Sequence, residues 1–174
     1  RRSFLKKTAA ITGGVSLMGL GGTTLSNCSA SPSLFKISIA EWSLNKGMRS
    51  GEIDHLDFAK IAKRSFGIDA IEYVNQLFAD KSGGSGKYVK EMKTIADGEG
   101  VKSLLIMCDR EGALGDPDNS ARAKAVENHH RWVDAAKYLG CHSIRVNAQS
   151  EGEYDEQMEL AADGLSRLTE YGSK

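Results

Sequence analysis

Seven side chains that suit the binding of a small polar molecule stand at or near the ends of short apolar runs. They are Glu41, Trp42, Glu72, Asn75, Asp109, Arg145 and Asn147. Carboxylates accept hydrogen bonds from hydroxyl groups and can act as general acids or bases, whereas arginine and asparagine side chains donate to oxygen atoms. These residue types predict contacts with substrate hydroxyl and carbonyl oxygens, provided that the fold brings them together.

Each candidate also has a structural interpretation. Glu72 could contact a substrate hydroxyl, or it could pair with Arg145, which occupies the corresponding place in a later segment. Arg145 and Asn147 could bind a substrate oxygen or make structural hydrogen bonds. Trp42 could form an apolar wall of a binding site or simply pack. Glu41 and Asp109 are acidic residues of expected loops, where carboxylates are commonly solvated.

A glycine followed by a short apolar run recurs along the chain. Gly67, Gly100 and Gly140 stand 33 and 40 residues apart, and the runs after Gly67 and Gly140 share an isoleucine at the fourth following position. Each glycine follows an amphipathic segment, as the residue that ends a helix does. The repeated order of helix, glycine and strand predicts right-handed βαβ units and a parallel sheet.

The pattern predicts four strands and four helices. The strands are expected at 35–42, 70–74, 103–108 and 143–148, and the helices at 54–66, 87–97, 121–139 and 155–171. Asp54 is the expected N-cap of the first helix, and Gly140 and Gly172 are expected to end the third and fourth. Residues 79–86, rich in glycine and serine, are expected to form a flexible connection.

Four strand–helix units are half of a (β/α)8 barrel, which needs about 200 to 250 residues. The predicted fold class is therefore α/β of the TIM-barrel type, with residues 34–174 forming its N-terminal half. An open, four-stranded flavodoxin-like sheet is the alternative in this length range. Because a half barrel leaves two parallel edge strands uncovered, we expect it to be poorly stable as a monomer.

Residues 1–33 are expected to be a twin-arginine export signal and a tether. The first seven residues, RRSFLKK, match that pattern, and a weakly apolar, glycine-rich run follows. Cys28 ends a lipobox-like stretch and could be lipidated, although Asn27 departs from the small residue usual there; cleavage near Ala30 is the alternative. The expected location is the periplasm or cell envelope, with the export machinery as a partner and membrane contact only through the signal or lipid.

Composition argues against nucleic-acid binding. The formal net charge is +0 and only 7% of the residues are aromatic, so the chain offers neither a basic surplus nor a stacking stripe. Cys108 and Cys141 are expected at opposite ends of neighbouring parallel strands, too far apart for a disulfide, and hence as free thiols. The histidines are expected to be structural or solvated, with His55 on the face opposite the strand ends that carry the candidates.

Three segments, at 38–44, 67–76 and 135–147, resemble the sugar phosphate isomerase/epimerase family, the xylose isomerase-like barrels. The resemblance implies a (β/α)8 barrel that isomerises or epimerises a sugar, a keto-sugar or an inositol, commonly with one divalent metal. Trp42 would then face a sugar ring. It also implies that the metal ligands, two Glu, an Asp and a His, come from strands five to eight. No metal ligand and no catalytic residue are therefore assigned within this chain.

The resemblance leaves two other functions to weigh. An apurinic endonuclease would carry zinc-binding histidines at the ends of the second and third strands, where this chain has Asn75 and Asp109. The alternative that remains is a non-catalytic carbohydrate-binding envelope lipoprotein of the same fold. An oligomer is compatible with either function.

Overall fold

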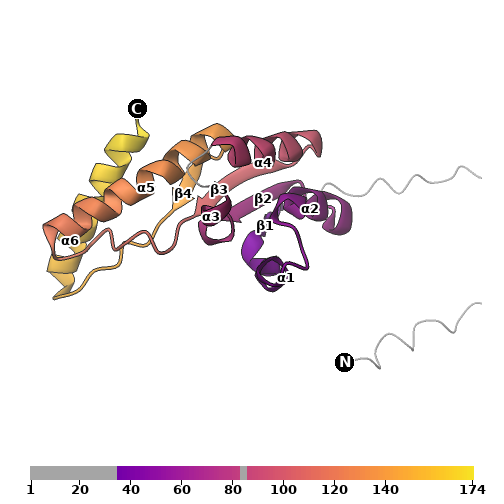
Figure 1. The fold of residues 1–174 in the computed structure, drawn as a ribbon. Helices are drawn as coiled ribbons and strands as arrows, with labels where there is room; N and C mark the ends of the chain where they lie inside the picture. Colours follow the sequence, from indigo (N-terminus) through magenta and orange to yellow (C-terminus); the bar gives the residue numbers. More distant parts are fainter. Residues whose placement is uncertain (1–34, 83–85) are drawn as a thin grey trace, which may run out of the picture. The chain divides into compact units, whose positions relative to one another are not determined.

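The computed structural model describes residues 35–82 and 86–174 (Figure 1). The expected export signal and tether at 1–33, including Cys28, lie outside the described residues. Residues 35–174 form one compact unit. In the part of the chain that the structure describes, no helix is both long enough and apolar enough to cross a membrane.

The unit is built on one parallel sheet whose strands follow each other in sequence order. The strands are β1 (Ile39–Ala40), β2 (Ala70–Val74), β3 (Lys102–Met107) and β4 (Ser143–Arg145). The order β1-β2-β3-β4 is that of consecutive barrel strands and differs from the flavodoxin order, in which the chain reverses direction within the sheet. The predicted α/β fold of TIM-barrel type, with four βα units, is thereby confirmed.

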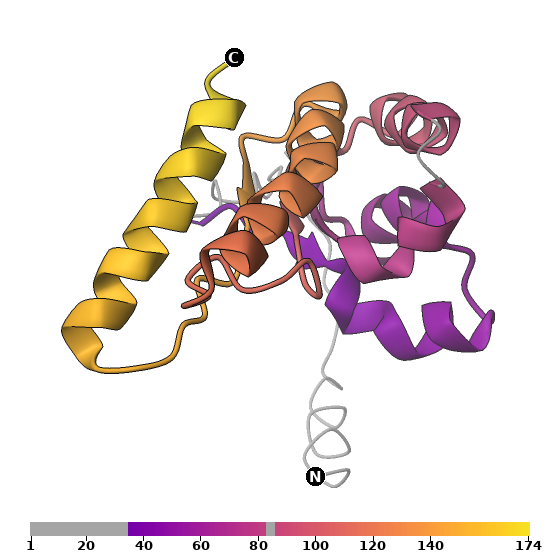
Figure 2. The same ribbon diagram turned by 60° about the vertical axis from the view of Figure 1, so that its left-hand side comes forward.

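Within residues 35–82 and 86–174, six α-helices connect and follow the strands. They are α1 (Asn45–Ser50), α2 (Phe58–Phe66), α3 (Ala79–Ser82), α4 (Gly86–Gly98), α5 (Asn119–Leu139) and α6 (Tyr154–Gly172). Side chains of α2, α4 and α5 pack with those of β2 and β3 in one core, and Figure 2 shows α6 (yellow) beside α5 (orange). Every crossover between neighbouring strands therefore contains a helix on the same side of the sheet, as the repeated pattern predicted.

The two faces of the sheet differ in burial. Side chains on the helix side form the core, and the largest of them are Phe58, Ile71, Tyr73, Phe78, Ile106 and Trp132. On the other face, Glu72, Leu105 and Met107 are only half-buried, and Arg145 is exposed. In a closed barrel this second face would line the interior.

Local signals for helix ends are mostly confirmed. The Asp54 side chain accepts a hydrogen bond from the Leu56 backbone N–H at 2.9 Å, and Gly140 ends α5 with φ of 81°. Gly172 does not end its helix as predicted, because it lies inside α6 and Ser173 follows as the cap. Residues 79–82 of the predicted flexible connection instead form the short helix α3.

The first predicted strand is much shorter than expected. Only Ile39 and Ala40 pair with β2, because β2 itself begins at Ala70 and leaves the preceding residues without a neighbouring strand. Directly after Ala40 the chain turns into a 3-10 helix, Glu41–Leu44, and then into α1. The sequence did not predict helix α1, because this segment contains a glycine and buries no side chain that would give an apolar periodicity.

Candidate functional site

Asp109 is the centre of a polar cluster at the carboxyl ends of the strands. Its Oδ1 accepts hydrogen bonds from Arg145 Nη1 at 3.2 Å and Asn147 Nδ2 at 3.0 Å, and its Oδ2 accepts one from Gln76 Nε2 at 3.3 Å. The three carboxyl ends of β2, β3 and β4 therefore meet here. The side chains of Asp109 and Arg145 are 24% and 44% exposed, so the cluster remains open to a ligand.

Asn75 holds the loop that carries Asp109. Its Oδ1 accepts from the Asp109 backbone N–H at 3.0 Å, while its Nδ2 donates to the Asp109 carbonyl and to Glu111 Oε1, each at 3.0 Å. The Asn75 side chain is buried. These contacts make Asn75 a positioning residue, because they hold the backbone that carries Asp109.

The loop after β3 has an unusual backbone. Arg110 has φ of 65°, a left-handed conformation that residues other than glycine seldom adopt, and Gly112 follows with φ of 99°. Glu111 between them is buried, and Arg131 Nη2 reaches its Oε1 at 2.8 Å. Glu111 was not among the predicted site residues. The sequence could have indicated it, because Asp109 and Glu111 flank Arg110 just after a strand.

Trp42 extends the cluster toward β1. Its ring is half-exposed, and the Arg49 guanidinium carbon lies 5.5 Å from the ring centroid. Arg49 Nη2 in turn donates to Gln76 Oε1 at 3.5 Å, which links Trp42 to Asp109 through Arg49 and Gln76. Neither Arg49 nor Gln76 was predicted, because α1 and the turn after β2 gave no pattern in the sequence.

Glu41 lies beneath this edge and is buried, not solvated as an acidic loop residue was expected to be. Its Oε2 accepts from the Val74 backbone N–H at 2.7 Å, and its Oε1 lies 2.8 Å from His55 Nε2. Tyr88 Oη lies 2.9 Å from the other ring nitrogen of His55. Burial raises the pKa of Tyr88, so the phenol carries its proton at neutral pH.

The expected position of His55 is therefore wrong. A helix that follows a strand runs back antiparallel to it, so its first residues lie at the carboxyl edge of the sheet. His55 opens the 3-10 helix His55–Asp57, which leads into α2, and it contacts Glu41 at that edge. The other histidines lie elsewhere: His129 is buried in α5, His130 stacks on Tyr171 with ring centroids 3.6 Å apart, and His142 contacts Ser143.

Glu72 does not pair with Arg145. Its Oε1 accepts from Ser38 Oγ at 2.6 Å, whereas Arg145 is held by Asp109. Glu72 lies on the half-buried face of the sheet, toward the interior of a closed barrel. It is thus separate from the hydrogen bonds that join Asp109, Arg145 and Asn147.

Cys108 and Cys141 are free thiols, as expected. Burial raises the pKa of the Cys108 thiol to about 12 and that of Cys141 to about 11, so both are protonated at neutral pH. Within residues 35–82 and 86–174, no group of three or more histidine, cysteine, aspartate and glutamate side chains could hold a metal ion. The described part of the cluster therefore does not fit the divalent metal that the resemblance implies.

Solved structures of sugar epimerases share this fold. A 3-keto-D-glucoside 4-epimerase from E. coli has a TM-score of 0.55 at 18% identity, with 68% of this chain and 46% of that chain covered. A D-psicose 3-epimerase from Clostridium cellulolyticum H10, solved with D-tagatose, has a TM-score of 0.61 at 15% identity and covers 80% and 49%. A protein from Sinorhizobium meliloti 1021 has a TM-score of 0.58 at 22% identity and covers 79% and 46%.

The chain spans about half the length of these structures. No curated protein matches the sequence significantly. A family model described as xylose isomerase-like TIM barrel matches residues 59–174, which is most of the chain and includes three of the four strands. With four parallel strands in barrel order and polar side chains gathered at their carboxyl ends, the chain belongs to the xylose isomerase-like TIM barrel family.

Proposed function

We propose that this chain forms the sugar-binding part of an isomerase or epimerase that acts on a sugar, a keto-sugar or an inositol. The observation that carries the proposal is the half-exposed cluster of Asp109, Arg145 and Asn147 at the carboxyl ends of the strands. Ligands of TIM-barrel enzymes bind at this end of the barrel. The names of the similar epimerases, one of them solved with D-tagatose, support a sugar as the ligand class.

The cluster has the chemistry that a polyhydroxylated ligand needs. The Asp109 carboxylate accepts hydrogen bonds from hydroxyl groups, while Arg145 and Asn147 donate to hydroxyl or carbonyl oxygens. The exposed face of Trp42 suits the apolar C–H face of a sugar ring. Asn75 and Glu111 keep the Asp109 loop in place, so that the acceptor is oriented before the ligand arrives.

The described residues account for binding and orientation rather than for proton transfer. Asp109 already accepts three hydrogen bonds, one of them from a guanidinium, and these contacts hold its carboxylate in one orientation. No metal-ligand group is present in the described ranges. The contacts of Asp109 also suit a second candidate function, carbohydrate binding without catalysis.

A binding and turnover experiment tests both functions. The full chain is titrated calorimetrically with aldoses, ketoses and inositols, and each mixture with added Mg²⁺ or Mn²⁺ is followed by carbon-13 NMR for epimers or isomers. We expect Asp109→Asn to weaken sugar binding at least tenfold, because the amide replaces one acceptor oxygen with a donor. Asp97→Asn, a carboxylate on α4 that pairs with Lys93, is the matched control and should bind normally.

The outcomes separate the candidates. Binding with turnover supports the isomerase or epimerase, whereas binding without turnover supports sugar binding by this chain and is expected for both functions. If no sugar binds, or if Asp109→Asn and Asp97→Asn bind equally well, the cluster is not the sugar site and both proposals fail.

We also propose that residues 1–33 direct export by the twin-arginine route and that Cys28 receives a lipid, on the sequence pattern alone. Replacing Arg1 and Arg2 by lysine should abolish export of a fused reporter that must fold before translocation. Cys28→Ala should remove labelling by radioactive palmitate and leave export intact. Export that survives the double lysine change, or labelling that survives Cys28→Ala, would contradict the respective part.

A further inference from the structure

The loop after β3 holds Arg110 in a backbone conformation that arginine seldom adopts. In the part of the chain that the structure describes, Arg110 is the only residue other than glycine with a positive φ, 65°. In this left-handed region the Cβ atom crowds the following carbonyl oxygen, a cost that glycine avoids. Such strain persists only where surrounding contacts enforce it, and it is concentrated at ligand sites.

The residues on both sides of Arg110 enforce this conformation. Asn75 bonds the backbone N–H and the backbone carbonyl of Asp109, each at 3.0 Å. On the other side, Asn128 Nδ2 donates to the Glu111 carbonyl at 3.1 Å. Asn75 follows β2 and Asn128 lies on α5, so this chain itself supplies the anchors, whichever strands complete the barrel.

The two carboxylates beside Arg110 already have guanidinium partners. Arg145 Nη1 lies 3.2 Å from Asp109 Oδ1, and Arg131 Nη2 lies 2.8 Å from Glu111 Oε1. Neither neighbouring carboxylate therefore requires the Arg110 guanidinium. Arg110 is exposed just after β3, at the carboxyl end of the sheet, where ligands of TIM-barrel enzymes bind.

We propose that Arg110 is a specificity-determining residue that binds an anionic group of the ligand, a carboxylate or a phosphate carried by the sugar. A guanidinium stays charged at physiological pH and presents parallel N–H donors that match the oxygens of either group. The strained loop fixes the backbone from which this side chain extends, beside the Asp109 carboxylate. The inference rests on the proposed sugar binding at Asp109 and narrows its ligand class to anionic sugars.

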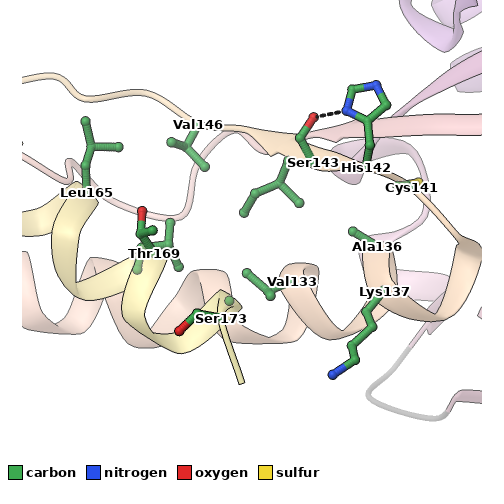
Figure 3. A pocket seen from close by; sticks show the side chains of 13 residues that line it. Val133, Ala136, Lys137, Cys141, His142, Ser143, Val146, Leu165, Thr169 and Ser173 are labelled. Atoms are coloured by element: carbon green, nitrogen blue, oxygen red, sulfur yellow. Dashed lines mark hydrogen bonds between the residues drawn. The ribbon is translucent and has the colours of Figure 1, made fainter.

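The groove between β4, α5 and α6 is a poorer place for an anion (Figure 3). Its lining is mostly apolar and includes Val133, Val146 and Leu165. In Figure 3, Lys137 extends away from this space. An anionic group there would lose hydration without gaining a guanidinium, and burying an unpaired charge is costly. The carboxyl end of β3 therefore suits the anion better.

Matched neutral and anionic sugars test this inference by calorimetric titration of the full chain. The probes are D-glucose with D-glucuronate and D-glucose 6-phosphate, and D-fructose with D-fructose 6-phosphate, so that a carboxylate and a phosphate are distinguished. We expect an anionic sugar to bind at least about tenfold more tightly than its neutral counterpart, because hydrogen bonds between charged groups are strong. Arg110→Ala should abolish this preference and leave the affinity for the neutral sugar unchanged. Arg64→Ala, which removes an exposed guanidinium paired with Glu99 on α2, is the control and should keep the preference.

Unfolding in urea separates a ligand-binding role of Arg110 from a structural one. Arg110→Ala keeps the strained backbone and should unfold at the same urea concentration as the unmodified protein. Arg110→Gly relieves the strain and should unfold at a higher urea concentration than Arg110→Ala, although it also loses the preference for anionic sugars. A marked fall in the unfolding midpoint of Arg110→Ala would show that the guanidinium holds the fold, and it would overturn the inference.

The titrations also distinguish this inference from the proposed function on which it rests. If neutral and anionic sugars bind equally well, or if the preference survives Arg110→Ala, the role of Arg110 is wrong while sugar binding by this chain stands. If no sugar of either kind binds, the proposed function fails and the role of Arg110 fails with it.

Discussion

His55 Nε2 lies 2.8 Å from Glu41 Oε1, and both side chains are almost completely buried. The pair joins the 3-10 helix that leads into α2 to the residue that follows β1. Glu41 also accepts a hydrogen bond from the Val74 backbone N–H. Val74 directly precedes Asn75, which holds the Asp109 loop. A buried carboxylate and imidazole thus support the edge on which the candidate site lies.

Removing the imidazole from this pair should destabilise the protein markedly. In His55→Leu the Glu41 carboxylate remains buried with one partner fewer, and such a loss costs about 3 kcal/mol. Lys124→Gln, which breaks the exposed pair with Glu127, should cost far less, because solvent screens that pair. Urea unfolding at pH 7 measures both. Equal losses of unfolding free energy in the two variants would show that burial does not increase the contribution of the Glu41–His55 pair to stability.

Gly164 allows α6 to approach the loop after β3. A Cβ atom at this position would lie 1.9 Å from the Leu114 carbonyl oxygen, a backbone atom that cannot move away cheaply. Gly164→Ala should therefore destabilise the protein by about 2 kcal/mol or more, despite the better helix propensity of alanine. Gly98→Ala in α4 has no heavy atom within 4 Å of the added carbon and should stabilise by about 0.5 kcal/mol. Thermal unfolding of both variants decides whether close approach or propensity dominates.

Asp163 should make a specific contribution to stability in acid. A hydrogen bond from Arg122, with the nearby charge of Arg167, lowers the pKa of this carboxyl below 3.8 in the folded protein. A lowered folded-state pKa gives stability that is present above the unfolded pKa and is lost as the pH falls through the folded one.

The stability difference between wild type and Asp163→Asn should accordingly be constant from pH 7 to about pH 5 and shrink below pH 3.8. Urea unfolding across this range measures it. Glu159→Gln on the same helix controls for the loss of one negative charge. A difference that stays constant down to pH 2.5 would contradict the role of Asp163.

The two described cysteines should resist alkylation while the protein is folded. With a pKa of about 12 for Cys108, roughly one thiol in ten thousand is ionised at pH 8, and the thiolate is the reactive form. Cys141, with a pKa of about 11, should react slowly but faster than Cys108. Iodoacetamide labelling followed by peptide mass spectrometry measures both, with the unfolded chain in guanidinium as the control. Equal labelling rates in the folded and unfolded chain would be the contrary result.

The sequence alone determined the order of the main elements. Strand β2 has the predicted bounds, and α5 and α6 differ from prediction by one or two residues, because periodic apolar side chains, Asp54 and Gly140 act through neighbours in the chain. The family could also be anticipated, because three segments, at 38–44, 67–76 and 135–147, resemble it. Asp109, Arg145 and Asn147 were expected at strand ends, and the structure joins them by hydrogen bonds because parallel strands align their carboxyl ends.

Only the tertiary structure decided which partner each polar side chain takes. Glu72 is bonded by Ser38 rather than Arg145, Asn75 holds a loop, and His55 lies beside Glu41. These contacts join residues that are 14 to 34 positions apart. They depend on strand register and helix direction, which local sequence patterns do not specify. The length of β1 was likewise decided by where β2 begins, because a strand extends only as far as its neighbour can pair with it.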